Sequence, residues 1–240
     1  MEQLYKPNLT VGVLGGMGPY ATLAFFEKIL HLSPAKKDWE HLHLIIDNNP
    51  HIPSRSRAYL YKEESPVKSM IESCKKLENY PVDIIAIPCN SAMHFLNPVK
   101  EKINVPILNI IEITSKQLKK KLNPGKKIAV LGGIITYSEK LYKPFLEKEG
   151  FIFVDHEEVD QSLIVSHIED IKKNGIANIS DFKNFINKYI LIYQPDAIIL
   201  GCTEFSYLLD VSDSVNSILI DSNTELASYV VGLAYKKNDD

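Results

Sequence analysis

Short apolar runs alternate with amphipathic stretches along almost the whole chain. The runs are rich in β-branched residues and end at Gly, Pro, Asn, Asp or another polar break, which is typical of buried strands. They are LTVGVLGG, HLIIDN, DIIAIP, PILNII, KKIAVLGG, FIFVD, DAIILG and SILIDS. Because helical patterns lie between these runs, the sequence predicts an α/β fold with mainly parallel strands. Ligands of such folds bind beyond the carboxyl ends of the strands.

The clearest helical pattern is SPVKSMIESCKKLENY, residues 65–80. Ser65 is a good N-cap and Pro66 suits the first helical position. The apolar residues that follow fall on one face at spacings of three and four, and Cys74 is one of them. We therefore expect Cys74 to be an ordinary core residue.

Parts of the sequence are repeated. The segment PVDIIAIPCNSA is matched by PDAIILGCTEF, since in both an apolar run ends at a cysteine followed by polar residues. The two cysteines, Cys89 and Cys202, lie 113 positions apart (202 − 89). VGVLGGMG and IAVLGGII match at an offset of 117 (130 − 13), and VPILNIIE and NSILIDSN at an offset of 111 (218 − 107). Similar offsets at three places indicate a duplicated unit.

The duplication predicts two similar α/β lobes with mainly parallel sheets, related by a pseudo-twofold axis, with the active site in the cleft between them. We expect an N-terminal lobe of residues 1–114 and a C-terminal lobe of residues 115–222. A C-terminal helix, 223–240, is expected to pack back on the N-terminal lobe. Each lobe then carries one cysteine at the end of the equivalent strand, and the two strand ends face each other.

A thiol at the end of a strand is most often a small core residue. The matched settings of Cys89 and Cys202 favour a chemical role instead, because a thiol at the start of a helix is expected to have its pKa lowered by the helix dipole. Inversion at carbon needs two bases on opposite faces of one small molecule. One base removes a proton, and the other delivers a proton to the opposite face.

Composition excludes several classes of function. The 240 residues carry a net charge of −3 and their lysines are scattered, so the chain lacks the basic patch of a nucleic-acid-binding protein. It has no apolar stretch long enough for a membrane span and no signal-peptide pattern, so we expect a cytoplasmic protein. Three cysteines in no metal-ligand spacing predict reduced thiols and no metal site.

Arginine is rare in this lysine-rich chain, occurring only at Arg55 and Arg57. Both lie in the loop after HLIIDN, which is expected on the same side of the cleft as the cysteines. A guanidinium group holds a carboxylate through two hydrogen bonds, a geometry that lysine cannot supply. The sequence leaves both readings of this loop open, a carboxylate anchor or two chance arginines at the surface.

Four motifs together resemble the aspartate/glutamate racemase family, whose members work without pyridoxal phosphate. The motifs are GVLGGMGPYAT, NNPHIPSR, PCNSA and LGCTE. They occur in the order and at the spacing of the family, and the resemblance runs over nearly the whole chain. It implies the two-lobed racemase fold, a homodimer, no cofactor, and an acidic amino acid as substrate, aspartate before glutamate.

The resemblance also implies roles for individual residues. Cys89 and Cys202 resemble the catalytic acid–base pair. The implied substrate-binding residues are Met17, Gly18, Arg55, Asn90, Ser91, Thr136, Lys172, Thr203 and Glu204. The sequence departs from the usual family pattern at Ser54, Met93, Ser206 and Tyr207.

Two functions from different classes stay open beside racemisation. GMGPYA, residues 16–21, fits the glycine pattern of dinucleotide-binding proteins, and Asp47 ends the next predicted strand as a ribose-binding acid would. The chain would then be a dinucleotide-binding oxidoreductase, which leaves the paired cysteines unexplained. The second possibility is a two-lobed carboxylate-binding protein without catalytic activity.

Overall fold

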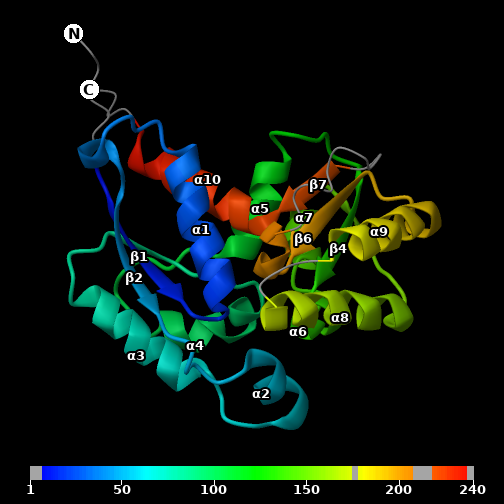
Figure 1. Cartoon of the computed structure of the whole chain (residues 1–240), viewed down its shortest axis with the longest axis horizontal. Helices are drawn as coiled ribbons and strands as arrows, with labels where there is room; N and C mark the ends of the chain where they lie inside the picture. The colour runs from blue at the N-terminus through cyan, green and yellow to red at the C-terminus, as the bar shows by residue number, and fades with distance from the viewer. Residues whose placement is uncertain (1–6, 175–177, 208–217, 237–240) are drawn as a thin grey trace.

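The computed structural model describes residues 7–174, 178–207 and 218–236, and it confirms an α/β fold with two parallel sheets (Figure 1). The first sheet has the order β2-β1-β3, with β1 at Thr10–Gly15, β2 at His43–Asn48 and β3 at Ile84–Ala86. The second has the order β5-β4-β6-β7, with β4 at Lys127–Gly132, β5 at Ile152–Val154, β6 at Ala197–Gly201 and β7 at Ile218–Asp221.

The helices cover the faces of the two sheets, as apolar strands buried on both sides require. They are α1 (Pro19–Leu32), α2 (Arg55–Tyr61), α3 (Val67–Glu78), α4 (Leu96–Lys100), α5 (Ile110–Leu118), α6 (Ile134–Ser138), α7 (Lys143–Lys148), α8 (Glu158–Asn174), α9 (Ile179–Tyr193) and α10 (Ser222–Ala234), with 3-10 turns at Asp38–Glu40 and Ser91–Phe95. Within the described ranges, no helix has the length and apolar character needed to span a membrane.

The predicted helix at residues 65–80 is confirmed as α3, although it begins at Val67 and Pro66 occupies the capping position. The Oγ atom of Ser65 accepts a hydrogen bond from the Val67 amide at 3.4 Å, so both residues act just before the helix. Cys74 is fully buried, with no exposed surface. Its predicted place in the core is therefore confirmed.

One predicted strand is wrong. The run PILNII, residues 106–111, forms only an isolated bridge between Ile107 and Ile85 before α5 begins at Ile110. The reason is the side chain of Asn109, whose Oδ1 atom accepts hydrogen bonds from the amides of Ile111 and Glu112 and starts the helix. The isoleucines after Asn109 then form the buried face of a helix instead of a strand.

The two sheets have matching strand orders. Ile107 bridges to β3 on the side where β7 pairs with β6 in the second sheet. The order β2-β1-β3 followed by this bridge therefore parallels β5-β4-β6-β7. The arrangement is consistent with the duplication and with the pseudo-twofold axis expected from the sequence.

The lobes share part of their core. One apolar cluster combines Val11 and Phe25, from the N-terminal part of the chain, with Val130, Ile199 and Val230 from the C-terminal part. Helix α10 packs against α1 and α5 (Figure 1), and the Asn223 side chain donates to the carbonyl of Ala21 at 3.2 Å. The boundary expected after residue 114 lies within α5 and stays a prediction.

Candidate active site

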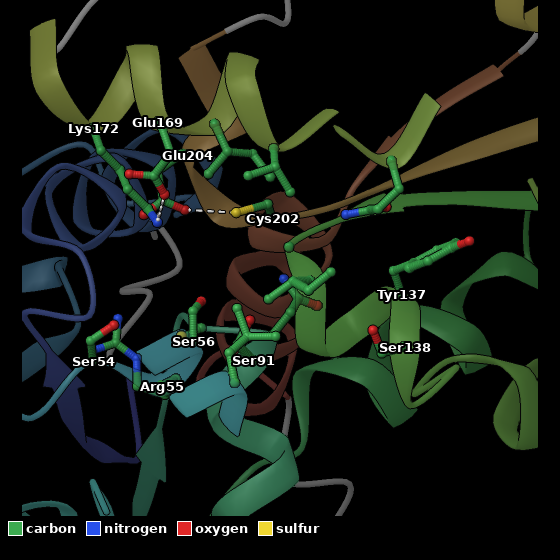
Figure 2. A pocket seen from close by; sticks show the side chains of 18 of the residues that line it. Ser54, Arg55, Ser56, Ser91, Tyr137, Ser138, Glu169, Lys172, Cys202 and Glu204 are labelled. Atoms are coloured by element: carbon green, nitrogen blue, oxygen red, sulfur yellow. Dashed lines mark hydrogen bonds and ion pairs between the residues drawn. The ribbon is translucent and has the colours of Figure 1, made fainter. Parts of the chain in front are cut away.

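A cavity of about 470 Å³ lies between the two sheets, beyond the carboxyl ends of their strands (Figure 2). This is where ligands bind in parallel α/β folds. Its walls come from both lobes and are formed by Met17, Ser54, Arg55, Ser56, Leu60, Cys89, Asn90, Ser91, Gly133, Ile134, Tyr137, Ser138, Glu158, Gln161, Ser162, Val165, Ile168, Glu169, Lys172, Cys202, Thr203 and Glu204. Apart from Gly18 and Thr136, every site residue expected from the sequence is in this lining.

The two paired cysteines line the same cavity. Cys89 follows β3 and is 6% exposed, whereas Cys202 follows β6 directly and is partly exposed. The third cysteine, Cys74, lies in the core, where burial raises the pKa of its thiol to about 12. The thiols of Cys89 and Cys202 are therefore the two that can act on a molecule in the cavity.

Cys202 donates a hydrogen bond from its Sγ atom to Oε2 of Glu204, at 3.0 Å (Figure 2). Burial raises the pKa of Cys202 well above its ordinary value, and the negative charge of Glu204 raises it further. The expected lowering by a helix dipole is wrong for this thiol. Residues 203–207 form a 3-10 turn after it, and burial beside a carboxylate outweighs any dipole. Cys202 is thus a protonated thiol that is ready to donate.

Glu204 is buried, with 3% of its surface exposed. One of its oxygens, Oε2, accepts from Cys202, while Oε1 is buried without a hydrogen-bond partner among the described residues. A buried carboxylate oxygen without a partner is costly. The Oε1 atom is therefore suited to accept a hydrogen bond from a ligand.

Arg55 begins α2, after the N-cap Ser54. Its Nη2 atom donates to the carbonyl of Met17 at 2.7 Å, and its Nη1 atom makes a longer bond of 3.4 Å to the carbonyl of Pro53. These bonds hold the guanidinium at the cavity wall, while Nε is buried without a partner among the described residues. Met17 reaches Arg55 because Gly16 turns the chain with φ of 84°, where an added Cβ would lie 2.2 Å from the backbone of Asn49.

Lys172 lies on α8, and its Nζ atom is 2.8 Å from Oε1 of Glu169 (Figure 2). Burial acts to lower the pKa of this lysine, but the acidic groups around it, Glu204 and Glu169 among them, together outweigh burial and raise it. Lys172 is therefore a cation at the same end of the cavity as Glu204. Its charge is already partly balanced by carboxylates of the protein.

Two expected ligand groups hold the lobes together instead of pointing freely into the cavity. The amide of Asn90 donates to Ser222 Oγ at 3.0 Å and accepts from the hydroxyl of Tyr142 at 2.6 Å. The hydroxyl of Thr203 donates to the carbonyl of Pro88 at 3.0 Å. Both residues therefore fix the loops that carry the cysteines.

The remaining expected residues, Ser91, Gly18 and Thr136, lie in three different places relative to the cavity. Ser91 lines the cavity, whereas Gly18 lines an adjoining hollow and approaches Glu204. Thr136 is not part of either lining. Its methyl side packs beneath the second glycine loop, where a Cβ added to Gly132 would lie 2.7 Å from Cγ2 of Thr136. A role of Thr136 in direct substrate contact stays a prediction.

One wall of the cavity was not predicted from the sequence, apart from Lys172 at its end. One face of α8 supplies Glu158, Gln161, Ser162, Val165, Ile168, Glu169 and Lys172. These positions recur at spacings of three and four, which is the signature of one helix face. The signal was present, but the face mixes polar and apolar residues and so lacks the hydrophobic periodicity that marks a core helix.

Nucleotide and metal binding receive little support from the side chains around the cavity. Asp47, which would bind the ribose of a dinucleotide, lies in a separate hollow with Lys76 and Tyr80 and does not line the cavity. Across the described residues, no group of three or more His, Cys, Asp or Glu side chains is arranged to hold a metal ion.

Comparison with known proteins identifies the family. The model of the Asp/Glu/hydantoin racemase family matches residues 14–230. The chain is 30% identical to the broad specificity amino-acid racemase RacX of Bacillus subtilis over 234 residues, 94% of this chain and 99% of RacX. It is also 30% identical to the glutamate racemase of Buchnera aphidicola, over 74% of this chain and 68% of that protein. The solved structure of Picrophilus torridus aspartate racemase has a TM-score of 0.81, with 29% identity and 96% of each chain covered. The chain belongs to the Asp/Glu/hydantoin racemase family, as its motifs predicted.

Proposed function

We propose that this enzyme racemises a free α-amino acid without a cofactor, using Cys89 and Cys202 as its two acid–base groups. The observation that carries the proposal is that these thiols, from matching strand ends in two lobes, line one cavity of about 470 Å³. Aspartate, followed by glutamate, is the substrate that the motifs imply. Neither a dinucleotide-binding oxidoreductase nor a silent binding protein explains the paired thiols in one cavity.

In the proposed reaction, the thiolate of Cys89 removes the proton from Cα, and the thiol of Cys202 delivers its own proton to the opposite face. The starting C–H bond breaks, a new C–H bond forms, and the configuration at Cα is inverted. The product complex holds Cys89 as the thiol and Cys202 as the thiolate. A thiolate beside the Glu204 carboxylate is a strong base, so it readily removes the proton in the reverse direction.

The charge that develops on the α-carboxylate needs stabilisation, because Cα–H is a very weak acid. Arg55 supplies it, since its guanidinium is held by the Met17 carbonyl and its buried Nε lacks a partner among the described residues. Glu204 accepts a hydrogen bond from the α-ammonium group through Oε1, which is likewise buried and without a partner among the described residues. The zwitterion is thereby held at two points, and Cα is kept between the two sulfur atoms.

The proposal extends to the setting in which the enzyme works. All three cysteines are free thiols, which fits a reducing compartment such as the cytoplasm. The family resemblance implies a homodimer. Light scattering on the purified chain measures the oligomeric state directly, and a single monomeric peak would contradict a homodimer.

The test is a chiral assay of purified enzyme with the L- and D-enantiomers of aspartate, glutamate and a set of neutral and basic amino acids. We expect at least one of these amino acids to be inverted whether the L- or the D-enantiomer is supplied. Cys89→Ala and Cys202→Ala should each reduce inversion by about 1000-fold or more, while Cys74→Ala, outside the cavity, should retain it. Equal activity of all three variants would overturn the proposal, and binding without inversion would favour a silent binding protein.

A further inference from the structure

The cavity is elongated, and its two ends differ in charge. The face of α8 that forms one wall runs from Glu158 to Lys172, about 21 Å at 1.5 Å per residue. Figure 2 shows Lys172, Glu204 and Arg55 on one side of Cys202, and Tyr137 and Ser138 on the other. We call these the cationic end and the distal end.

The distal end lies beside the start of α8. The hydroxyl of Tyr137 donates to the carbonyl of His156 at 3.2 Å, two residues before Glu158. The walls of this end are formed by Gly133, Ile134, Tyr137, Ser138, Glu158, Gln161, Ser162 and Val165. None of these described lining residues is a cation, and one is a carboxylate.

The polar groups of the distal end are largely engaged by the protein. Gln161 is 2% exposed, and its Nε2 atom donates to the carbonyl of Gly132 at 3.0 Å. Its Oε1 atom lies 3.1 Å from Nε2 of His156. The hydroxyl of Ser162 donates to the backbone carbonyl of Glu158, at 3.1 Å. What the distal end offers a ligand is therefore an apolar wall, including Ile134 and Val165, followed by the carboxylate of Glu158.

The cationic end has capacity for one carboxylate. Of its two cations, Lys172 is already paired with Glu169 at 2.8 Å and lies close to Glu204, which leaves Arg55 as the main anchor. If Arg55 holds the α-carboxylate and Glu204 the α-ammonium, the side chain of the substrate extends toward the distal end. A second carboxylate placed there would meet Glu158 and no cation.

We infer that the enzyme's preferred substrate is an amino acid with a long aliphatic side chain that ends in a cation, such as lysine, rather than a dicarboxylate. The inference rests on the proposed function and assigns Glu158 as the group that selects the side chain. The methylene groups pack on Ile134 and Val165, and the ammonium or guanidinium head meets Glu158. Aspartate would leave most of the cavity unfilled, and its second carboxylate would meet no cation at the distal end.

The test compares initial rates of α-proton exchange in deuterated water for L-lysine, L-norleucine, L-aspartate and L-glutamate, followed by NMR. Norleucine has nearly the shape of lysine without its charge. We expect kcat/KM to be about tenfold higher for lysine than for norleucine, and lower still for both dicarboxylates. Glu158→Gln should reduce the lysine to norleucine ratio by only about threefold, because Glu158 is exposed and solvent screens its charge.

Glu157→Gln is the matched control, because Glu157 neighbours Glu158 in the sequence but does not line the cavity. It should leave the lysine to norleucine ratio unchanged. A preference for aspartate or glutamate would overturn the inference while leaving the racemase function intact. A lysine preference that Glu158→Gln does not change would overturn the role of Glu158. Absence of exchange with every amino acid would instead overturn the proposed function, and the inference with it.

Discussion

The sulfur of Cys202 and Oε2 of Glu204 are joined by a hydrogen bond of 3.0 Å inside the cavity, with the thiol as donor. This contact makes the two cysteines unequal. Cys202 is kept protonated because burial and the adjacent carboxylate raise the pKa of its thiol. The resting enzyme therefore already has one acid in place, and it needs only the other cysteine to be ionised.

Replacing the carboxylate should change the titration of this thiol. In Glu204→Gln the negative charge is removed and the shape is kept, so the pKa of Cys202 should fall toward its ordinary value. Alkylation of Cys202 by iodoacetamide, followed by mass spectrometry against pH, should then have its midpoint at lower pH than in the wild type. The buried Cys74 should stay unmodified in both proteins, and its lack of modification serves as the control that both are folded. An unchanged midpoint would mean that Glu204 does not control Cys202.

The two arginines should respond differently to the same conservative change. In Arg55→Lys the planar fork that bonds to the Met17 carbonyl is lost, so kcat/KM should fall by about 100-fold. Arg57→Lys is the matched control, since Arg57 pairs with Glu63 on the surface and should change kcat/KM less than about twofold. Steady-state kinetics of both variants is the measurement. Similar losses in the two would contradict the assignment of Arg55 as the anchor.

Stability should depend more on the buried hydroxyl that joins the two lobes than on the exposed one. Tyr142→Phe removes the donor to Asn90 Oδ1 in a fully buried setting and should lower the free energy of unfolding by about 1–3 kcal/mol. Tyr59→Phe removes the exposed contact with Glu139, which also joins the two lobes, and should cost less than about 0.5 kcal/mol. Urea unfolding of the two variants separates these effects. A larger loss for Tyr59→Phe would reverse this account of how the lobes are held.

Stability should decrease in alkaline solution because of Cys74. Its pKa is about 12 in the folded protein against an ordinary value of 9.0, so above pH 9 the unfolded chain releases a proton that the folded chain keeps. The free energy of unfolding should then fall between pH 9 and pH 12, by up to about 1.4 kcal/mol per pH unit from this thiol. Cys74→Ala should have a shallower decrease, measured as the unfolding midpoint against pH. Parallel pH curves for the two proteins would argue against a buried neutral thiol.

The parts of the fold that the sequence predicted well are those with a strong local signal. β-branched runs between helical patterns located seven of the strands. The inner strands β1, β4 and β6 are almost wholly buried, as such runs predict, whereas the edge strands β2 and β5 keep exposed positions. The exception was residues 106–111, where the cap made by Asn109 overrode an apolar run. Asn109 is three residues before Glu112, and hydrophobic pattern alone does not reveal which structure such a run adopts.

In the site, the cysteines were predictable because their settings are repeated in the sequence. The bonds that decide chemistry were not predictable. The contact of Cys202 with Glu204 and the pairing of Lys172 with Glu169 depend on side-chain directions that spacing does not specify. The role of Asn90 in joining the lobes depends on Tyr142, which is distant in the sequence and becomes its neighbour only through folding.

The most direct test of the central claim is deuterium incorporation at low conversion, in deuterated water, with the amino acid that the enzyme inverts fastest. If Cys89 and Cys202 act on opposite faces, the inverted product carries deuterium at Cα, while the remaining substrate keeps its original proton. An inverted product that retains the substrate's own proton, or a substrate that gains deuterium before any inversion, would indicate a single base and contradict the account.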